Sequence, residues 1–319
     1  MTTSRRTSQP AADLPAASRV IAPGEDEWPA QLDDLGPAEP PARLFLRGRR
    51  LRVVSPRAVA IVGSRNPTAA GLDAARTVAR SLAEAGVTVI SGLALGIDAA
   101  AHQAALDAGG YTVAVLGTGT DVCYPERNAP LQSAIAERGT LVSEHPDGTG
   151  SRPYHFPARN RIIAGLAAGV VIVEGTMRSG ALITARHALD ANRDVFAVPG
   201  SIRNPLAAAP NELIRTAGAA LVTEVNHIFE ELEPELVWSG PVQLGLGPRA
   251  LGLDDFETRV LGFLDDTPVS PDRICRELGA QPGAVALALA RLEIRGFAQK
   301  RTAGYRITTG GARALSPGA

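Results

Sequence analysis

Short runs of apolar, mostly β-branched residues recur through the middle of the chain and alternate with longer alanine-rich stretches. Runs that are apolar along their whole length are typical of parallel strands buried on both faces by helices. The pattern therefore predicts an α/β fold with a doubly wound parallel sheet over residues 57–232. The predicted strands are AVAIVG (58–63), VTVISG (87–92), TVAVLG (112–117), LVSE (141–144), VVIVEG (170–175), VFAVPG (195–200) and AALV (219–222).

The segments on either side of this region have a different composition. Residues 1–22 are rich in Ser, Thr, Pro and Ala and are expected to be disordered. Residues 23–56 contain Trp28, several prolines and the apolar piece LFLRG. We expect them to form a short lead-in segment with little regular structure. Residues 233–253 are rich in Pro and Gly and are predicted to be a linker.

A second, smaller pattern follows the predicted linker. DFETRVLGFLD, SPDRICRELG and PGAVALALARLEIRG predict three helices, and FAQKRT and GYRITT predict a hairpin around Ala303 and Gly304. Three helices and a β-hairpin indicate a small C-terminal winged-helix domain over residues 254–310, with a tail over 311–319. Its candidate recognition helix (282–296) is mostly apolar. We therefore expect an accessory or interaction role rather than sequence-specific reading of duplex DNA.

Composition narrows the classes of function. The chain is 45% apolar and 20% charged, which fits a globular fold, and its formal net charge is only −1. A nucleic-acid role would therefore need a local basic patch, and Lys300 is the only lysine, so its phosphate contacts must come from arginine. Cys123 and Cys275 lie far apart, and the five histidines show no metal-ligand spacing. We expect no metal, no cofactor, no membrane segment and a cytoplasmic location.

Candidate binding residues follow the predicted strands, because ligands of open parallel sheets bind beyond the carboxyl ends of the strands. Glycine-rich turns there bring the backbone close to a ligand, and helix N-termini offer free N–H groups. FPARNR (156–161) is predicted to open the helix before the fifth strand, with Arg159 and Arg161 at its start. Together with Arg65 and Arg178, these arginines predict an edge that binds anions.

Several ligands and reactions can be considered for this edge of the sheet. The first turn, GSRNPTAAG, is not G-x-G-x-x-G, and the chain has no P-loop, which argues against dinucleotide binding and a P-loop ATPase. Asp98 and His102 could pair as acid and base, but a helix-capping Asp98 with His102 packed behind it is the favoured reading. Phe156 is either a core aromatic residue or a platform on which bases stack.

The order of the motifs resembles the DprA/Smf family of bacterial DNA-processing proteins, which act in natural transformation. The resemblance covers roughly residues 25–232. It rests on AIVGSRNPTAAG, SGLALGIDAAAHQAAL, AVLGTGTDVCYPERN, LVSEHP, FPARNRIIAGLAAGVVIVEG, RSGALITARHAL and VFAVPGSI. The predicted winged helix is similar to a domain that many members carry at the C-terminus. The resemblance implies an extended Rossmann-like fold that binds single-stranded DNA, forms a homodimer and loads the RecA recombinase, without catalysis.

The resemblance also implies a set of DNA-binding residues. Arg152 is added to that set because family sites often include lysine and none is available before Lys300. A helical domain precedes the core in many members, and we expect it to be missing or vestigial here. The DNA-binding residues that we predict are Gly63, Ser64, Arg65, Arg152, Phe156, Arg159, Asn160, Arg161, Arg178, Ser179 and Gly180.

Two other functions stay open on the sequence alone. One is a nucleotide-binding or nucleotide-hydrolysing Rossmann-like enzyme of the lysine-decarboxylase-like type. The P-G-G-x-G-T-x-x-E motif of those enzymes supplies a catalytic glutamate, whereas the comparable stretch here, GTMRSGALITA, has no acidic residue from Gly175 to Ala185. The other is a winged-helix transcription regulator whose α/β domain senses a ligand.

Overall fold

The computed structural model describes residues 17–53, 57–232, 253–264, 268–294, 297–301 and 304–307. It divides the chain into two compact units, residues 1–238 and 239–319. The predictions made for residues 1–16, for the linker over 233–252 and for the tail over 311–319 fall outside the described residues, as does Ala303.

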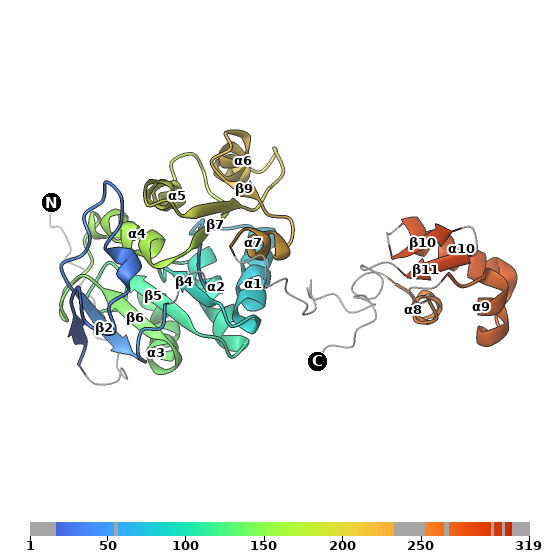
Figure 1. Ribbon diagram of the computed structural model, residues 1–319, viewed down its shortest axis with the longest axis horizontal. Helices are drawn as coiled ribbons and strands as arrows, with labels where there is room; N and C mark the ends of the chain where they lie inside the picture. The colour runs from blue at the N-terminus through green and yellow to red at the C-terminus, as the bar shows by residue number, and fades with distance from the viewer. Residues whose placement is uncertain are drawn as a thin grey trace, which may run out of the picture. The chain divides into compact units, whose positions relative to one another are not determined.

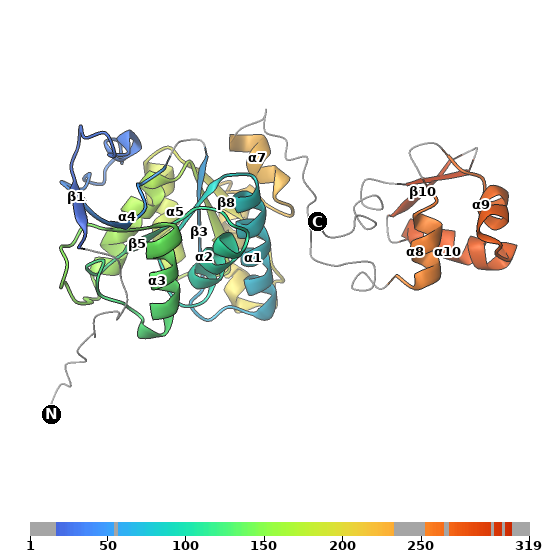
Figure 2. The ribbon, with the colours of Figure 1, turned by 90° about the horizontal axis from the view of Figure 1, so that it is seen from below.

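The larger unit is a nine-stranded sheet in the order β1-β2-β6-β5-β4-β3-β7-β8-β9, with helices on both of its faces (Figures 1 and 2). Every predicted apolar run forms a strand, and β3 to β9 pair in parallel. The doubly wound prediction is therefore confirmed. The strands are β1 (Arg19–Ile21), β2 (Leu44–Gly48), β3 (Ala58–Gly63), β4 (Thr88–Ser91), β5 (Thr112–Leu116), β6 (Thr140–Ser143), β7 (Gly169–Val173), β8 (Asp194–Ala197) and β9 (Ala220–Leu221).

Strands β1 and β2 correct two expectations, disorder through residue 22 and little regular structure in residues 23–56. β2 pairs antiparallel with β6, and β1 pairs antiparallel with β2. Leu44 and Leu46 of β2 are fully buried, so this strand adds to the core and covers the edge of the parallel strands. Arg47 holds the layer in place by donating to Thr120 Oγ1 at 3.0 Å and to Asp147 Oδ2 at 2.7 Å.

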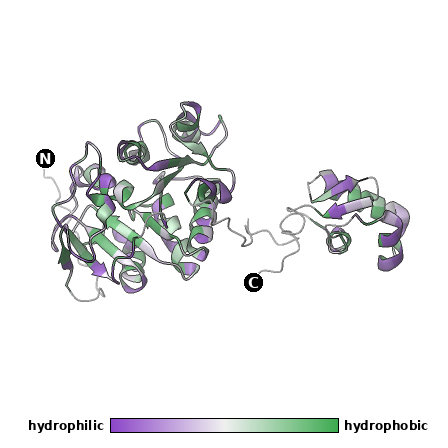
Figure 3. Cartoon of the chain, in the orientation of Figure 1, coloured by the Kyte–Doolittle hydropathy of each residue, from purple (hydrophilic) through white to green (hydrophobic). Residues whose placement is uncertain are grey.

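The alternation of side chains along β3 shows how both faces of the sheet are buried. Val59 and Ile61 join the core under helices α1, α2 and α7, whereas Ala60 and Val62 join the core under α4 and α5. Figure 3 shows these central strands as largely hydrophobic. The helices of this unit are α1 (Ala69–Glu84), α2 (Ile97–Asp107), α3 (Ala129–Arg138), α4 (His155–Leu166), α5 (Gly180–Asp190), α6 (Ala208–Arg215) and α7 (Asn226–Leu232), with short 3-10 turns η1 (Ala30–Leu32), η2 (Glu126–Asn128) and η3 (Pro205–Ala207).

Helix α4 begins earlier than the sequence analysis expected. It starts at His155, so Arg159 lies in its second turn and not at its N-terminus. Pro157 is compatible with this start, because proline fits the first turn of a helix, where its missing N–H has no acceptor. The free N–H groups of the helix therefore lie near Phe156, and the arginines are carried into the body of the helix.

The smaller unit contains α8 (Asp255–Leu261), α9 (Pro271–Leu278), α10 (Pro282–Ile294) and a hairpin of β10 (Ala298–Arg301) and β11 (Gly304–Ile307). This confirms the winged-helix prediction. Its own core includes Val260, Ile274, Leu289 and Leu292. Asp254 and Glu257 form a capping box at the start of α8, which fixes the first turn of that helix.

Candidate functional site

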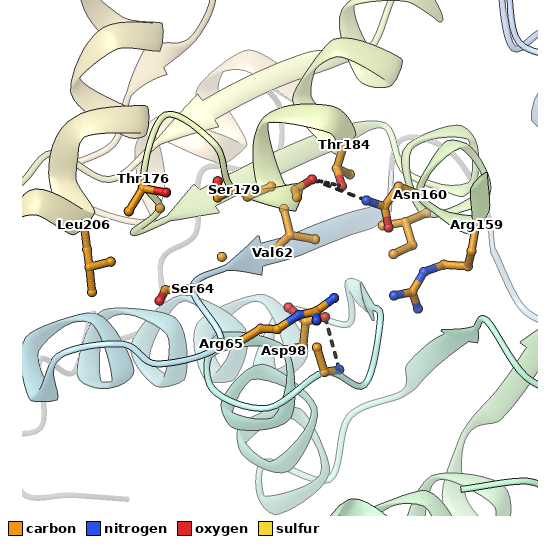
Figure 4. A pocket seen from close by; sticks show the side chains of 16 residues that line it. Val62, Ser64, Arg65, Asp98, Arg159, Asn160, Thr176, Ser179, Thr184 and Leu206 are labelled. Atoms are coloured by element: carbon orange, nitrogen blue, oxygen red, sulfur yellow. Dashed lines mark hydrogen bonds between the residues drawn. The ribbon is translucent and has the colours of Figure 1, made fainter. Parts of the chain in front are cut away.

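A pocket of about 250 Å³ lies where the order of the parallel strands changes direction, between the ends of β3 and β7. From β3 the chain adds β4, β5 and β6 on one side, and it then crosses through α4 to β7 on the other side. The loops that leave β3 and β7 diverge at this point, which is where open α/β sheets bind their ligands. Figure 4 shows the pocket, which is lined by Val62, Gly63, Ser64, Arg65, Ala94, Asp98, Arg159, Asn160, Ile163, Gly175, Thr176, Ser179, Gly180, Ala181, Thr184 and Leu206.

The turn after β3 supplies one wall of the pocket. A Cβ atom on Gly63 would lie 1.8 Å from the carbonyl oxygen of Val173, so β3 and β7 can approach this closely only with glycine here. Arg65 is exposed, and its side chain extends over the pocket toward that of Arg159 (Figure 4). Among the described residues, no carboxylate forms a salt bridge with Arg65, and its guanidinium carbon lies 6.0 Å from the ring centroid of Phe156.

Arg159 forms the floor of the pocket. Its side chain is buried, with 6% relative exposure. Its Nη1 atom donates to the carbonyl oxygen of Gly92 at 2.8 Å and to that of Val115. These carbonyls lie just after β4 and within β5, so Arg159 ties α4 to the ends of two strands. This arginine is placed to brace the fold, in contrast to the exposed Arg65.

Asp98 lies beside Arg159 and holds the loop that precedes α2. Its Oδ2 atom accepts from the backbone N–H of Gly92 at 3.1 Å and from that of Ala94 at 3.3 Å. Burial raises the pKa of the Asp98 carboxyl, and the positive charge of Arg159 opposes this rise. Gly96 is the N-cap of α2, so the Asp98 carboxylate fixes the loop ahead of the helix and does not bond to the N–H groups of its own first turn.

His102 is sealed in the core and makes its hydrogen bond away from Asp98. The Thr112 hydroxyl donates to the carbonyl oxygen of Val89 at 2.7 Å, so it must accept from His102 Nδ1, which lies 2.7 Å away. Burial and the nearby positive charge of Arg159 lower the pKa of His102 to about 3. The two residues therefore do not form an acid–base pair, and His102 packs behind the site as the sequence analysis favoured.

The remaining residues of the R-N-R motif point in different directions. Arg161 donates to both carboxylate oxygens of Glu144, at 2.9 and 2.6 Å, and to the carbonyl oxygen of Glu39 at 2.8 Å. It is not among the residues that line the pocket. Asn160 does line the pocket, and its Nδ2 atom donates to the carbonyl oxygen of Gly180 at 3.3 Å.

The turn before α5 forms the opposite wall. Ser179 is the N-cap of α5, but its hydroxyl is buried and has no hydrogen-bond partner among the described residues. Ser179 and Gly180 line the pocket at the positive end of the helix dipole. Arg178 lies exposed on the same loop and outside the pocket lining. The sequence analysis did not identify Thr176, Thr184 and Leu206 as pocket residues, and no motif distinguishes them.

Glu174 explains how the turn after β7 is fixed. Its Oε2 atom accepts from the Thr68 N–H at 2.8 Å, and its Oε1 atom accepts from the Thr68 hydroxyl at 2.6 Å and from Asn204 Nδ2 at 2.9 Å. Thr68 is the N-cap of α1. The buried carboxylate therefore connects β7 to the start of α1, a role that no motif in the sequence indicated.

Phe156 and Arg152 lie outside the lining of the pocket. Phe156 is half-buried at the second position of α4, where its ring fills the space that a side chain at Gly117 would need. Arg152 is exposed, and its Nη1 atom donates to the Tyr154 hydroxyl at 2.8 Å.

Two further properties concern the whole described part of the chain. Its His, Cys, Asp and Glu side chains form no group of three or more that could hold a metal ion. None of its helices is long and apolar enough to cross a membrane.

Comparisons with known proteins agree with this architecture. The family model described as DNA recombination-mediator protein A matches residues 19–233, and the model of the DprA winged helix domain matches residues 247–304. Protein Smf of Escherichia coli is 38% identical over 289 residues, which cover 89% of this chain and 76% of that protein. The DNA processing protein DprA of Streptococcus pneumoniae is 44% identical over 209 residues, which cover 66% of this chain and 72% of that protein.

Solved structures extend the similarity to the fold. The X-ray structure of DprA from Streptococcus pneumoniae superposes with a TM-score of 0.63 at 41% identity, covering 68% of this chain and 75% of that one. A structure of DNA processing protein A from Helicobacter pylori, which concerns the single-stranded DNA binding mode of that protein, gives a TM-score of 0.61 at 27% identity and covers 68% of this chain and 96% of that one. Since the family model matches well over half of its length, the chain belongs to the DprA/Smf family of DNA-processing proteins.

Proposed function

We propose that this chain binds single-stranded DNA at the pocket between β3 and β7, without reading its sequence, and that it acts as a recombination mediator. The observation that carries the proposal is the exposed Arg65, which forms no salt bridge among the described residues and extends over a pocket walled by glycine turns and the start of α5. A free guanidinium, close backbone and a helix N-terminus are groups that bind phosphate. Contacts of this kind give affinity without sequence information.

The size of the pocket is compatible with one unit of a polymer. Pockets that enclose a small molecule usually measure ~300–1,000 Å³, and this pocket has a volume of about 250 Å³. It is suited to one phosphate or sugar of a strand whose neighbouring nucleotides lie outside it. Phe156, beside Arg65, is then placed to stack on a base.

The nearby acidic groups support binding without catalysis. Glu174 is held by Thr68 and Asn204, and Asp98 is held by two backbone N–H groups. A general acid or base needs a carboxyl group within hydrogen-bond reach of the substrate. Both carboxylates act here as acceptors that fix loops, so the proposed role is that of a DNA-binding protein and not of an enzyme.

The description of the family as recombination mediators supports the finer proposal about partners. We propose that the chain acts as a homodimer that protects incoming single-stranded DNA and loads RecA onto it during natural transformation. Light scattering measures the mass of the free protein. A strand-exchange assay with and without the protein measures RecA loading, and unchanged exchange would contradict this part of the proposal.

Binding is tested by fluorescence anisotropy with labelled oligo-dT and a matched random duplex over a salt series. We expect tight binding of the single strand, weaker binding of the duplex, and an affinity that falls with salt. Arg65→Ala should weaken binding and reduce the slope of log K against log salt by ~0.7, the contribution of one phosphate on a single strand. The control is Arg80→Ala, because Arg80 is exposed near the far end of α1.

Two results would contradict the proposal. An Arg65→Ala protein that binds as tightly as wild type would remove Arg65 from the site. A wild-type protein that does not bind oligo-dT at low salt would exclude the DNA-binding function. Incubation with nucleoside monophosphates, with detection of free base, would then test the nucleotide-hydrolase alternative.

A further inference from the structure

Aromatic side chains gather next to the pocket, on loops at the carboxyl ends of β5 and β6. Tyr124 lies on the loop after β5, whereas Tyr154 and Phe156 flank the start of α4. We call Tyr124, Tyr154 and Phe156 the aromatic shelf. Because β5 and β6 follow β4 on the side of β3 away from β7, the shelf continues the carboxyl edge of the sheet beyond the pocket.

The shelf is joined to the pocket through Phe156. The rings of Tyr124 and Phe156 have centroids 5.2 Å apart and are tilted by 36°. Arg65, which lines the pocket, places its guanidinium carbon 6.0 Å from the centroid of the same Phe156 ring. A strand whose phosphate contacts Arg65 would therefore have its next bases beside these rings.

The two tyrosines are unusually exposed for aromatic residues. Tyr124 is 47% exposed and Tyr154 is 61% exposed. Among the described residues, the Tyr124 hydroxyl has no hydrogen-bond partner, so its ring contact with Phe156 is the only specific contact of the side chain. Exposed aromatic faces of this kind are the platforms on which proteins stack unpaired bases.

The loop that carries Tyr124 is firmly anchored beneath it. Val122 and Cys123 are buried, with 6% and 2% relative exposure. The Thr118 hydroxyl donates to the carbonyl oxygen of Val122 at 2.9 Å, and Cys123 Sγ donates to that of Pro125 at 3.3 Å. The anchored loop holds the Tyr124 ring in place, which reduces the entropy that the ring loses when a ligand binds to it.

Tyr154 is held in a similar way by neighbouring rings. Its ring contacts that of His155 edge-on, with centroids 4.7 Å apart, and His155 stacks on His145 at 3.9 Å. His155 Nδ1 lies 2.9 Å from the carbonyl oxygen of Gly117. The exposed Arg152 donates to the Tyr154 hydroxyl at 2.8 Å, which places a positive charge beside the exposed ring.

We propose that the aromatic shelf is a second nucleotide subsite, in which Tyr124 and Tyr154 stack on unpaired bases of the strand that leaves the pocket and Arg152 contacts its phosphate. The inference rests on the proposed function, and it adds Tyr124 and Tyr154 to the binding residues. Base pairs in a duplex have both faces covered by neighbouring pairs, so the shelf would favour single strands. Stacking tolerates every base and adds no sequence preference.

The test compares two oligo-dT lengths, about 6 and about 20 nucleotides, because single-strand sites of such modules span ~4–16 nucleotides. For the longer strand, we expect Tyr124→Ala with Tyr154→Ala to lower affinity by about 5-fold or more, since one stacked base contributes that much. The loss should be smaller for the shorter strand. Tyr124→Phe with Tyr154→Phe should retain the wild-type affinity, because phenylalanine keeps the stacking face. Leu189→Ala, an exposed apolar change near the end of α5, is the control.

A strand that lacks bases at its central positions separates stacking from a structural effect. The loss caused by the alanine variant should disappear on this abasic strand, and an equal loss would overturn the proposal. It would also be overturned if the alanine variant bound the longer strand as tightly as wild type while Arg65→Ala weakened binding. If the wild-type protein bound neither strand, the proposed function itself would fail, and the shelf with it.

Discussion

Replacement of Arg159 by methionine tests whether this side chain stabilises the fold or contacts DNA directly. The structure buries the guanidinium and directs Nη1 to the carbonyl oxygens of Gly92 and Val115, with Asp98 nearby. Methionine fills much of the same volume but donates no hydrogen bond. The change therefore leaves two buried carbonyls without this donor and a buried carboxyl without its positive neighbour.

The expected loss of stability follows from these contacts. A hydrogen bond that involves a charged group contributes ~1.5–3 kcal/mol, and removal of one partner of a buried charge pair costs ~3–5 kcal/mol. The two figures describe the same guanidinium and do not add. We therefore expect Arg159→Met to lower the free energy of unfolding by about 3–5 kcal/mol, a large part of the ~5–15 kcal/mol of a typical domain.

Urea denaturation followed by tryptophan fluorescence measures this loss. Trp28 is buried in the larger unit, and a Trp238→Phe background makes it the only reporter. Arg161→Met is the matched control, because Arg161 pairs with the partly exposed Glu144 at the surface and should cost only about 1 kcal/mol. Asp98→Asn should cost less in the Arg159→Met protein than in wild type, since the opposite charges of Asp98 and Arg159 interact.

An Arg159→Met protein with wild-type stability would refute this account of Arg159. If Arg159→Met unfolded at the wild-type urea concentration but bound oligo-dT much more weakly, Arg159 would be a DNA contact and not a brace. A stable variant with unchanged binding would show that the two carbonyl hydrogen bonds contribute little.

Three more predictions test other parts of the site. The pKa of His102 is about 3 in the fold and ~6.5 in the unfolded chain, so only the unfolded chain binds a proton at this residue between these pH values. The free energy of unfolding should therefore fall by up to ~1.4 kcal/mol for each unit that the pH decreases from ~6.5 to about 3. Urea titrations at several pH values measure this slope, and His102→Gln should remove it. Gly63→Ala should destabilise the fold by about 1–3 kcal/mol or more in the same assay, because its Cβ meets the backbone oxygen of Val173; wild-type stability would show that the strands can separate. Glu174→Gln should cost about 1–3 kcal/mol, because an amide NH₂ would face the donors of Thr68 or Asn204; an unchanged urea midpoint would contradict that role.

The sequence predicted the parallel strands well because a strand buried on both faces is apolar at every position. AVAIVG became β3 in full, and the glycine at its end is the one that the close approach of β7 requires. Strand β2 was missed for the opposite reason. LFLRG is short, it includes an arginine, and its partner β6 lies far along the chain, so only the tertiary pairing shows that it is a strand.

The R-N-R motif shows the limit of reading a site from residue types. Arg159 and Arg161 looked equivalent, but residues two apart on a helix point away from each other. Once α4 begins at His155, Arg159 is directed into the core and Arg161 toward Glu144. Arg65 has no such ambiguity, because it lies in a turn with no helix face to bury it.

The several roles of helix α4 restrict the substitutions that this helix can accept. Within two turns it carries the half-buried ring of Phe156 beside Arg65, the buried Arg159 that holds two strand ends, the pocket amide of Asn160 and the ion pair of Arg161 with Glu144. On the proposed function, a substitution in this helix that changes the affinity for single-stranded DNA would therefore also disturb the folded state. The side chains of Tyr124 and Arg178 are exposed and make few internal contacts. On the same proposal, adaptation to a different length or flexibility of DNA would be more accessible through these two side chains, with α4 held constant.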